Sequence, residues 1–131
     1  MKEKTIAFTI IAPNYLSYAK LLRNSLNEHH PEIKFILLLM GKQDIQDLGN
    51  KENFEIIDLE KIGVNNNYEI FFKYTLIEAC TAIKPFFIKY LMEKYPQHNI
   101  IYFDPDIYIY NKLDCLLDKL KNNNIVLTPH I

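Results

Sequence analysis

Short apolar runs alternate with segments of helical periodicity along most of the chain. Residues 4–12 are rich in β-branched and aromatic side chains and stop at Pro13-Asn14, which predicts a buried strand followed by a turn. Similar runs predict strands at residues 34–40, 54–57, 99–103, 107–110 and 125–127. Apolar side chains at helical spacing predict helices at residues 15–28, 68–83, 85–95 and 113–120, with a short helical turn at 43–48.

The order of these elements predicts an α/β fold with a mainly parallel sheet flanked by helices. Lys84-Pro85 is expected to interrupt or kink the long helical stretch, because proline lacks the N–H that a helix interior needs. Pro105 is expected to end regular pairing of the strand at residues 99–103. Ligands of such folds bind beyond the carboxyl ends of the strands, where residues 12–15 and 104–106 are expected to lie.

Composition narrows the classes of function. The 131 residues, 49% of them apolar, suit one domain spanning residues 1–131. A net charge of −1 provides no electrostatic footprint for nucleic acid or an anionic membrane. No apolar run approaches the ~18 residues that span a bilayer, and the charged start is unlike a signal peptide, so a cytoplasmic protein is expected. Cys80 and Cys115 have no metal-binding or redox spacing, which favours reduced thiols and leaves a disulfide as the alternative.

The candidate chemistry lies in Asp104-Pro105-Asp106, which ends an apolar run. Two carboxylates at the end of a strand can turn toward one hard divalent cation, Mn²⁺ or Mg²⁺, which in turn holds the phosphates of a substrate. The chain has three glycines and neither glycine-rich phosphate motif, so metal and side chains would have to hold a nucleotide. The alternative is that the two aspartates cap a turn around Pro105.

Several stretches in the same order resemble the family 8 glycosyltransferases, the GT-A fold group of glycogenin and the bacterial galactosyltransferases. They are residues 11–15 leading into 22–26, then 73–78, 81–86 and 101–107, and residues 127–130 resemble the corresponding stretch of the bacterial relatives. The resemblance spans nearly the whole chain. It implies a GT-A, Rossmann-like sheet and metal-dependent transfer of a hexose from a UDP-sugar to a glycan, lipid or protein acceptor. It also implies retention of the anomeric configuration.

Carried over by position, the resemblance implies that Asp104 and Asp106 bind Mn²⁺ or Mg²⁺, with Asp104 also near the ribose. Lys84 matches a basic position near the sugar or the phosphates of the nucleotide. Its alternative is an ordinary solvated lysine. Glu78 is expected to pair with Lys84 or Lys73, which is a structural role as often as a functional one.

The loop after the first strand matches the family's site for uracil and ribose. The resemblance implies that Ala12, Asn14 and Tyr15 line it, with Tyr15 stacking on the base and Asn14 hydrogen-bonding to it. The alternative for Tyr15 is an aromatic staple at the start of the helix. His130 is expected to be solvent-exposed rather than a metal or phosphate ligand.

Relatives in the family continue well beyond residue 131 of this sequence and carry the acceptor site and a further metal ligand in their second half. The chain is therefore interpreted as the nucleotide-sugar-binding half of a glycosyltransferase, truncated after the Asp-x-Asp motif. The alternative is an inactive nucleotide-binding or scaffold domain of the same fold. A haloacid-dehalogenase-like phosphatase fits poorly, because its nucleophilic aspartate comes early in the chain and Tyr108 stands where threonine or valine is expected.

Overall fold

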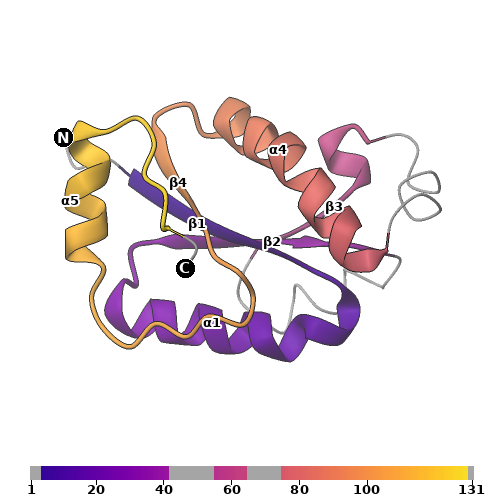
Figure 1. Ribbon diagram of the computed structural model, residues 1–131, viewed down its shortest axis with the longest axis horizontal. Helices are drawn as coiled ribbons and strands as arrows, with labels where there is room; N and C mark the ends of the chain where they lie inside the picture. The colour runs from indigo at the N-terminus through magenta and orange to yellow at the C-terminus, as the bar shows by residue number, and fades with distance from the viewer. Residues whose placement is uncertain (1–3, 42–54, 65–74, 130–131) are drawn as a thin grey trace.

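The computed structural model describes residues 4–41, 55–64 and 75–129, and its centre is a parallel sheet with helices on both faces (Figure 1). The strands are β1 (Lys4–Ile11), β2 (Lys34–Leu39), β3 (Glu55–Asp58) and β4 (His98–Tyr102). They lie in the order β3-β2-β1-β4, and every neighbouring pair is parallel. The prediction of an α/β fold with a mainly parallel sheet is confirmed.

Helices cover the two faces unequally. The α-helices are α1 (Leu16–His29), α4 (Leu76–Lys94) and α5 (Asp114–Asn122), and the 3₁₀ turns are η1 (Pro13–Tyr15) and η2 (Glu60–Ile62). In Figure 1, α4 lies above the sheet and α1 below it. Leucines of α5 pack into the same apolar cluster as Leu22 and Leu26 of α1, so α5 belongs to the layer of α1.

Side chains of β1 alternate between the two layers, as the pleat of a strand requires. Phe8 joins the cluster built on α4, together with Ile83 and Phe87. Ala7 and Ile11 join the clusters on the side of α1. β1 is buried on both faces from Ile6 to Ile11, and five of these six residues are apolar, the exception being Thr9, which is typical of a central parallel strand.

The same alternation in β4 decides which way the residues after it point. Ile101 and Phe103 are buried in the cluster of α1 and α5, whereas Tyr102 packs on the α4 side. Tyr102 is the register partner of Phe8, and the centroids of their rings are 5.2 Å apart. Residues two apart on a strand share a face, so Asp104 is directed toward the layer of α4.

The long helical stretch differs from the prediction in two ways. Thr75 is extended (φ −60°, ψ 160°) and caps α4, so the prediction of one helix running through residue 75 is wrong. The cap is a capping box in which Thr75 and Glu78 satisfy each other's backbone N–H groups.

Pro85 lies inside one continuous helix, so the predicted interruption there is also wrong. Burial of Ile83 and Phe87 on either side of Pro85 holds the helix to the sheet despite the missing N–H. Residues 43–48 and 68–74 of the predicted helices lie outside the described residues.

The predicted strand at residues 107–110 is wrong: these residues are in no strand, and side chains of α1 and of the residue after it accept from backbone N–H groups in and just after this segment. Ile109 N–H donates to Ser25 Oγ at 3.0 Å, and Leu113 N–H donates to His30 Nε2 at 2.7 Å. Ser25 and His30 are 1% and 3% exposed; the bond to Ser25 is buried and the bond to His30 is partly buried. His30 Nδ1 is the donor to Glu32 at 2.9 Å, because Nε2 accepts from Leu113. The chain after β4 is thereby fastened to α1.

The predicted strand at residues 125–127 is also wrong. These residues are in no strand, and Ile125 and Leu127 are exposed. No strand of the described part of the chain pairs with them, so their β propensity has no ladder to join. Cys80 and Cys115 are free thiols, as expected.

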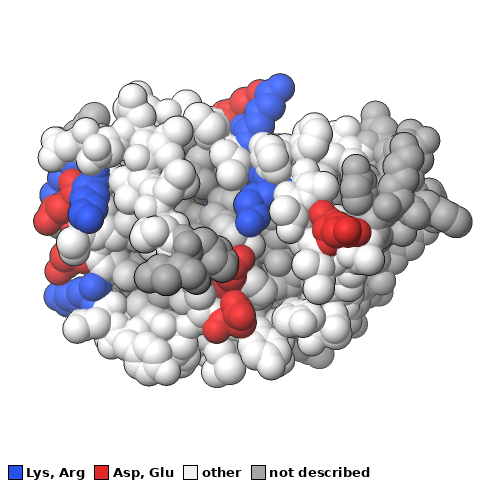
Figure 2. Space-filling view, in the orientation of Figure 1, with Lys and Arg blue, Asp and Glu red and all other residues white. Residues whose placement is uncertain are grey.

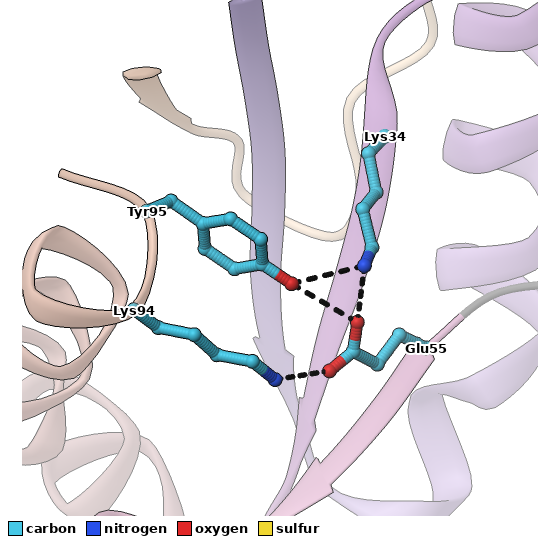
Figure 3. A network of polar contacts seen from close by, with 4 residues as sticks. All are labelled: Lys34, Glu55, Lys94 and Tyr95. Carbon is cyan, nitrogen blue, oxygen red and sulfur yellow. Dashed lines mark hydrogen bonds and ion pairs between the residues drawn. The ribbon is translucent and has the colours of Figure 1, made fainter. Parts of the chain in front are cut away.

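A polar network ties α4 to the sheet at the amino ends of β2 and β3 (Figure 3). Glu55 accepts from Lys34 and from Lys94, each at 2.6 Å, and Tyr95 bridges Lys34 and Glu55 with its hydroxyl. Burial alone would raise the pKa of Glu55, but the hydrogen bonds from the two ammonium groups lower it to about 2. The hydrogen bond to Glu55 raises the pKa of Lys94 to about 12. The network lies at the edge of the sheet opposite the Asp-x-Asp motif.

Candidate functional site

The two aspartates form the turn that comes after β4. The ladder of β4 ends at Tyr102, after which Phe103 N–H still donates to Phe8 C=O at 3.1 Å. Asp104 C=O then accepts from Ile107 N–H at 3.2 Å, which closes a β-turn with Pro105 in its second position. Asp106 is exposed, and so is Asp104. The turn is closed by the backbone, which leaves the carboxylates available for other partners.

Asp104 and Lys84 are brought together by Tyr102, which the sequence analysis did not single out. The Tyr102 hydroxyl donates to Asp104 Oδ1 at 2.8 Å. Lys84 Nζ, on α4, lies 3.9 Å from the centroid of the Tyr102 ring, which is a cation–π contact. The signal for this cluster was in the sequence, because Tyr102 and Asp104 are two residues apart at the end of a predicted strand and so share a face.

The electrostatics of the cluster arise from its partial burial. Burial raises the pKa of Tyr102, and the hydrogen bond to Asp104 and the negative charges of Asp104 and Asp106 raise it further. The phenol therefore keeps its proton and serves as a donor. Burial also raises the pKa of the Cys80 thiol, against the opposing effect of the nearby Lys84 ammonium. Cys80 and Asp106 therefore lie close enough to Tyr102 to affect its pKa, and Lys84 lies close enough to Cys80 to affect the pKa of the thiol.

The predicted nucleotide loop lies at the same edge of the sheet. Ala12 is 3% exposed and precedes η1, and Tyr15 N–H donates to Ala12 C=O at 3.0 Å. Asn14 is exposed, and the Tyr15 ring, 42% exposed, lies 5.5 Å from that of Tyr18. β1 and β4 are parallel neighbours, so this loop and the aspartate turn leave the sheet side by side. Within the described ranges, no hydrogen bond or ion pair joins the loop to the aspartates, and its role in binding a base stays a prediction.

Glu78 has a structural role, because it completes the capping box of α4 with Thr75. Hydrogen bonds from the backbone and hydroxyl of Thr75 lower the pKa of the Glu78 carboxyl. Lys73, the other expected partner of Glu78, and His130 lie outside the described residues.

The side chains of Asp104 and Asp106 suit a divalent cation that shares its ligands with a nucleotide. Among residues 4–41, 55–64 and 75–129, no three His, Cys, Asp or Glu side chains gather where they could hold a metal ion. Mg²⁺ bound to nucleotides keeps several waters and takes one or two protein carboxylates plus the phosphates of the substrate. Asp104 and Asp106, which are exposed and separated by one residue, fit this kind of site.

One face of the molecule carries charges of both signs around a hollow. In Figure 2, basic and acidic side chains lie close together near the middle of the face, and another mixed group lies over α5 at the left. The chain as a whole has a net charge of only −1. An anionic ligand would therefore be attracted by local groups rather than by the overall field.

The arrangement of strands and helices is shared with a solved glycosyltransferase. The structure superposes on the galactosyltransferase LgtC, solved in complex with donor and acceptor sugar analogues, with a TM-score of 0.56 and 21% sequence identity. The chain has a glycosyltransferase fold of the GT-A type. The match covers 86% of this chain and 41% of LgtC, so the chain spans less than half the length of that enzyme.

Comparison with protein-family models and with curated sequences identifies no relative. No protein-family model matches the chain, and no curated protein sequence matches it. The GT-A fold agrees with the resemblance inferred from the sequence, whereas membership of family 8 in particular stays a prediction. No helix in the described part of the chain is long and apolar enough to cross a membrane.

Proposed function

We propose that this chain is the nucleotide-sugar-binding half of a glycosyltransferase and that it binds a UDP-sugar together with Mn²⁺ or Mg²⁺ at Asp104 and Asp106. The observation that carries the proposal is the cluster at the carboxyl end of β4, where Tyr102 contacts both the exposed Asp104 carboxylate and the Lys84 ammonium and the exposed Asp106 follows two positions later. The GT-A fold supports it, because the superposed LgtC was solved with a donor analogue bound. In open α/β sheets, ligands bind at this edge.

Each residue then has a defined part in holding the donor. Asp104 and Asp106 hold the metal, which when bound would neutralise the negative charge of the departing diphosphate. Lys84 adds a positive charge on the α4 side for a phosphate oxygen. Asn14 and Tyr15 lie at the end of the neighbouring strand, where an exposed aromatic ring suits the face of a base. Ala12, at the base of this loop, leaves room close to the backbone.

Transfer to an acceptor belongs to a longer protein in this proposal. The matched part of LgtC is 41% of its chain, and an acceptor site and a further metal ligand would come from a second half. The hexose and the glycan, lipid or protein acceptor are then set by that half. A domain of the same fold that binds a nucleotide without turnover is the second candidate, favoured by the same coverage.

Calorimetry with UDP, with and without Mn²⁺, tests the proposal on the intact chain. Asp104→Asn and Asp106→Asn keep the shape of each side chain and remove its charge. Asp118→Asn is the matched control, since Asp118 is an exposed aspartate on α5 that pairs only with Lys121 at 2.6 Å among the described residues. We expect metal-dependent binding by the intact chain and the control, and its loss in the two site variants.

Absence of metal-dependent UDP binding by the intact chain would overturn the proposal. Equal binding by the intact chain and by both site variants would overturn the assignment of Asp104 and Asp106. Release of UDP from a UDP-sugar then separates the two candidates, because a binding domain retains the donor intact.

A further inference from the structure

We infer that Tyr102 is the positioning residue of this site: its hydroxyl holds the Asp104 carboxylate, and its ring holds the Lys84 ammonium. The inference rests on the proposed function, since it concerns how the chain prepares these two groups for a metal and a diphosphate. In that proposal Tyr102 itself does not touch the ligand. Tyr102 acts through Asp104 and Lys84.

The first contact fixes one oxygen of a metal ligand. Tyr102 donates to Asp104 Oδ1 at 2.8 Å, and no other partner of this carboxylate is found in the described ranges. Asp104 is exposed, so without the bond its side chain would sample several rotamers. Hydrogen bonds to ligating carboxylates orient them, and removing such partners typically weakens metal binding about 10–100-fold. The bond leaves Oδ2 of Asp104 for the cation.

The donor itself is fixed by the core. The Tyr102 ring lies 5.2 Å from the Phe8 ring, and Phe8 in turn makes an edge contact with Phe87 at 5.2 Å. Phe8 and Phe87 are fully buried. The buried rings therefore hold the Tyr102 ring in place. Its hydroxyl in turn holds the carboxylate of Asp104, which lies beyond the last ladder bond of β4.

The second contact keeps Lys84 close to Asp104 without pairing the two. Lys84 Nζ lies 3.9 Å from the centroid of the Tyr102 ring, and no ion pair joins Lys84 to Asp104 in the described part of the chain. A direct ion pair would set the ammonium in competition with the metal for the same oxygens. With the ring between them, the carboxylate is free for a cation and the ammonium for a phosphate.

Substitutions separate the two contacts. Tyr102→Phe removes the hydroxyl and keeps the ring under Lys84. Lys84→Met removes the charge and keeps the hydroxyl on Asp104. Tyr95→Phe is a matched control at the opposite edge of the sheet, because Tyr95 also donates its hydroxyl to a carboxylate, that of Glu55, at 3.2 Å.

The measurements are Mn²⁺ binding by electron paramagnetic resonance, UDP binding in Mn²⁺ by calorimetry, and thermal unfolding of each variant. We expect Tyr102→Phe to weaken Mn²⁺ binding in the presence of UDP by about tenfold, the lower end of the usual range because the bond is exposed. Lys84→Met should weaken UDP binding and leave Mn²⁺ binding alone unweakened. Tyr95→Phe should lower only thermal stability.

The outcomes distinguish this inference from the function on which it rests. If the intact chain binds no UDP with Mn²⁺, both are overturned. If the intact chain binds and folded Tyr102→Phe binds equally well, Tyr102 does not position Asp104, while the proposed function stands. If Tyr95→Phe weakens binding as much as Tyr102→Phe does, the effect reflects general stability, and the positioning role is again refuted.

Discussion

Glu55→Gln removes the carboxylate at the centre of the network in Figure 3 and should destabilise the fold in a pH-dependent way. Glu55 receives Lys34 and Lys94 at 2.6 Å each, and its side chain is only 28% exposed. Glutamine keeps the shape but not the charge, and its amide NH2 replaces one of the two oxygens that accept from the lysines. The variant therefore loses the ionic part of the network.

The pKa shift of Glu55 gives the size of the expected loss of stability. A fall of the pKa from 4.5 to about 2 corresponds to about 3 kcal/mol at about 1.4 kcal/mol per unit, as an upper bound. Because more than a quarter of the side chain and more of both lysines are exposed to screening solvent, we expect about 1–2 kcal/mol at pH 7. The shift of Glu55 exceeds that of Lys94 because Glu55 has two cationic partners.

The direction in which stability changes with pH follows from the pKa of Glu55, which is lower in the folded chain than in the unfolded chain. The stabilisation by Glu55 is fully present above pH 4.5, the pKa of the unfolded chain, and is lost as pH falls to about 2. Urea denaturation of the intact chain and of Glu55→Gln at pH 7, 5, 4 and 3 measures it. The difference in unfolding free energy should be constant between pH 7 and 5 and fall by more than half by pH 3.

Glu93→Gln is the control, because the Lys89–Glu93 pair spans 3.9 Å and both side chains are largely exposed. It should change stability by less than about 0.5 kcal/mol at every pH. A difference for Glu55→Gln that is the same at pH 7 and pH 3 would refute the ionic origin of the effect.

Two further substitutions test contacts that hold the layers in place. Ser25→Ala leaves the N–H of buried Ile109 without its partner and should cost about 1–3 kcal/mol in urea denaturation, with exposed Ser17→Ala unchanged as the control. An unchanged unfolding free energy would contradict the role of Ser25. Thr75→Ala removes the cap of α4 and should cost about 1 kcal/mol, measured in the same way. A cost indistinguishable from that of Thr81→Ala, inside the helix, would count against the capping box.

The sequence predicted the sheet well because its central strands, β1 and β2, are buried on both faces and are therefore rich in apolar residues, and β4 also contains a short apolar run. Three of them, at 4–12, 34–40 and 99–103, match β1, β2 and β4 to within a residue at each end. The start of α4 was missed although its signal was local. Thr75 and Glu78 have capping-box spacing, but apolar periodicity running through residues 68–83 outweighed it.

Errors after β4 had a different origin. Residues 107–110 have a strand-like sequence, yet the N–H groups of Ile109 and Leu113 are taken by Ser25 and His30, which lie 84 and 83 positions from their partners. The pattern of neighbouring residues in the sequence cannot indicate a hydrogen-bond partner so far along the chain. The same limit applies to the residues of the candidate site. The place of Asp104 after β4 could be predicted from the strand pattern, but the contact of Lys84 with the ring of Tyr102 depends on how α4 packs. The role of these residues in binding stays a prediction.

The fastening of residues 107–113 to α1 also bears on the order in which the chain folds. Contacts between residues more than 80 positions apart form late, because a long loop must first be closed. During synthesis, β1, α1 and β2 can dock as a local unit well before Leu113 leaves the ribosome. The aspartate turn is held between β4 and the bonds to Ser25 and His30, so we expect it to be among the last parts to acquire native geometry. A folding intermediate of this chain would accordingly have strands β1 and β2 paired before the aspartate turn takes its native geometry.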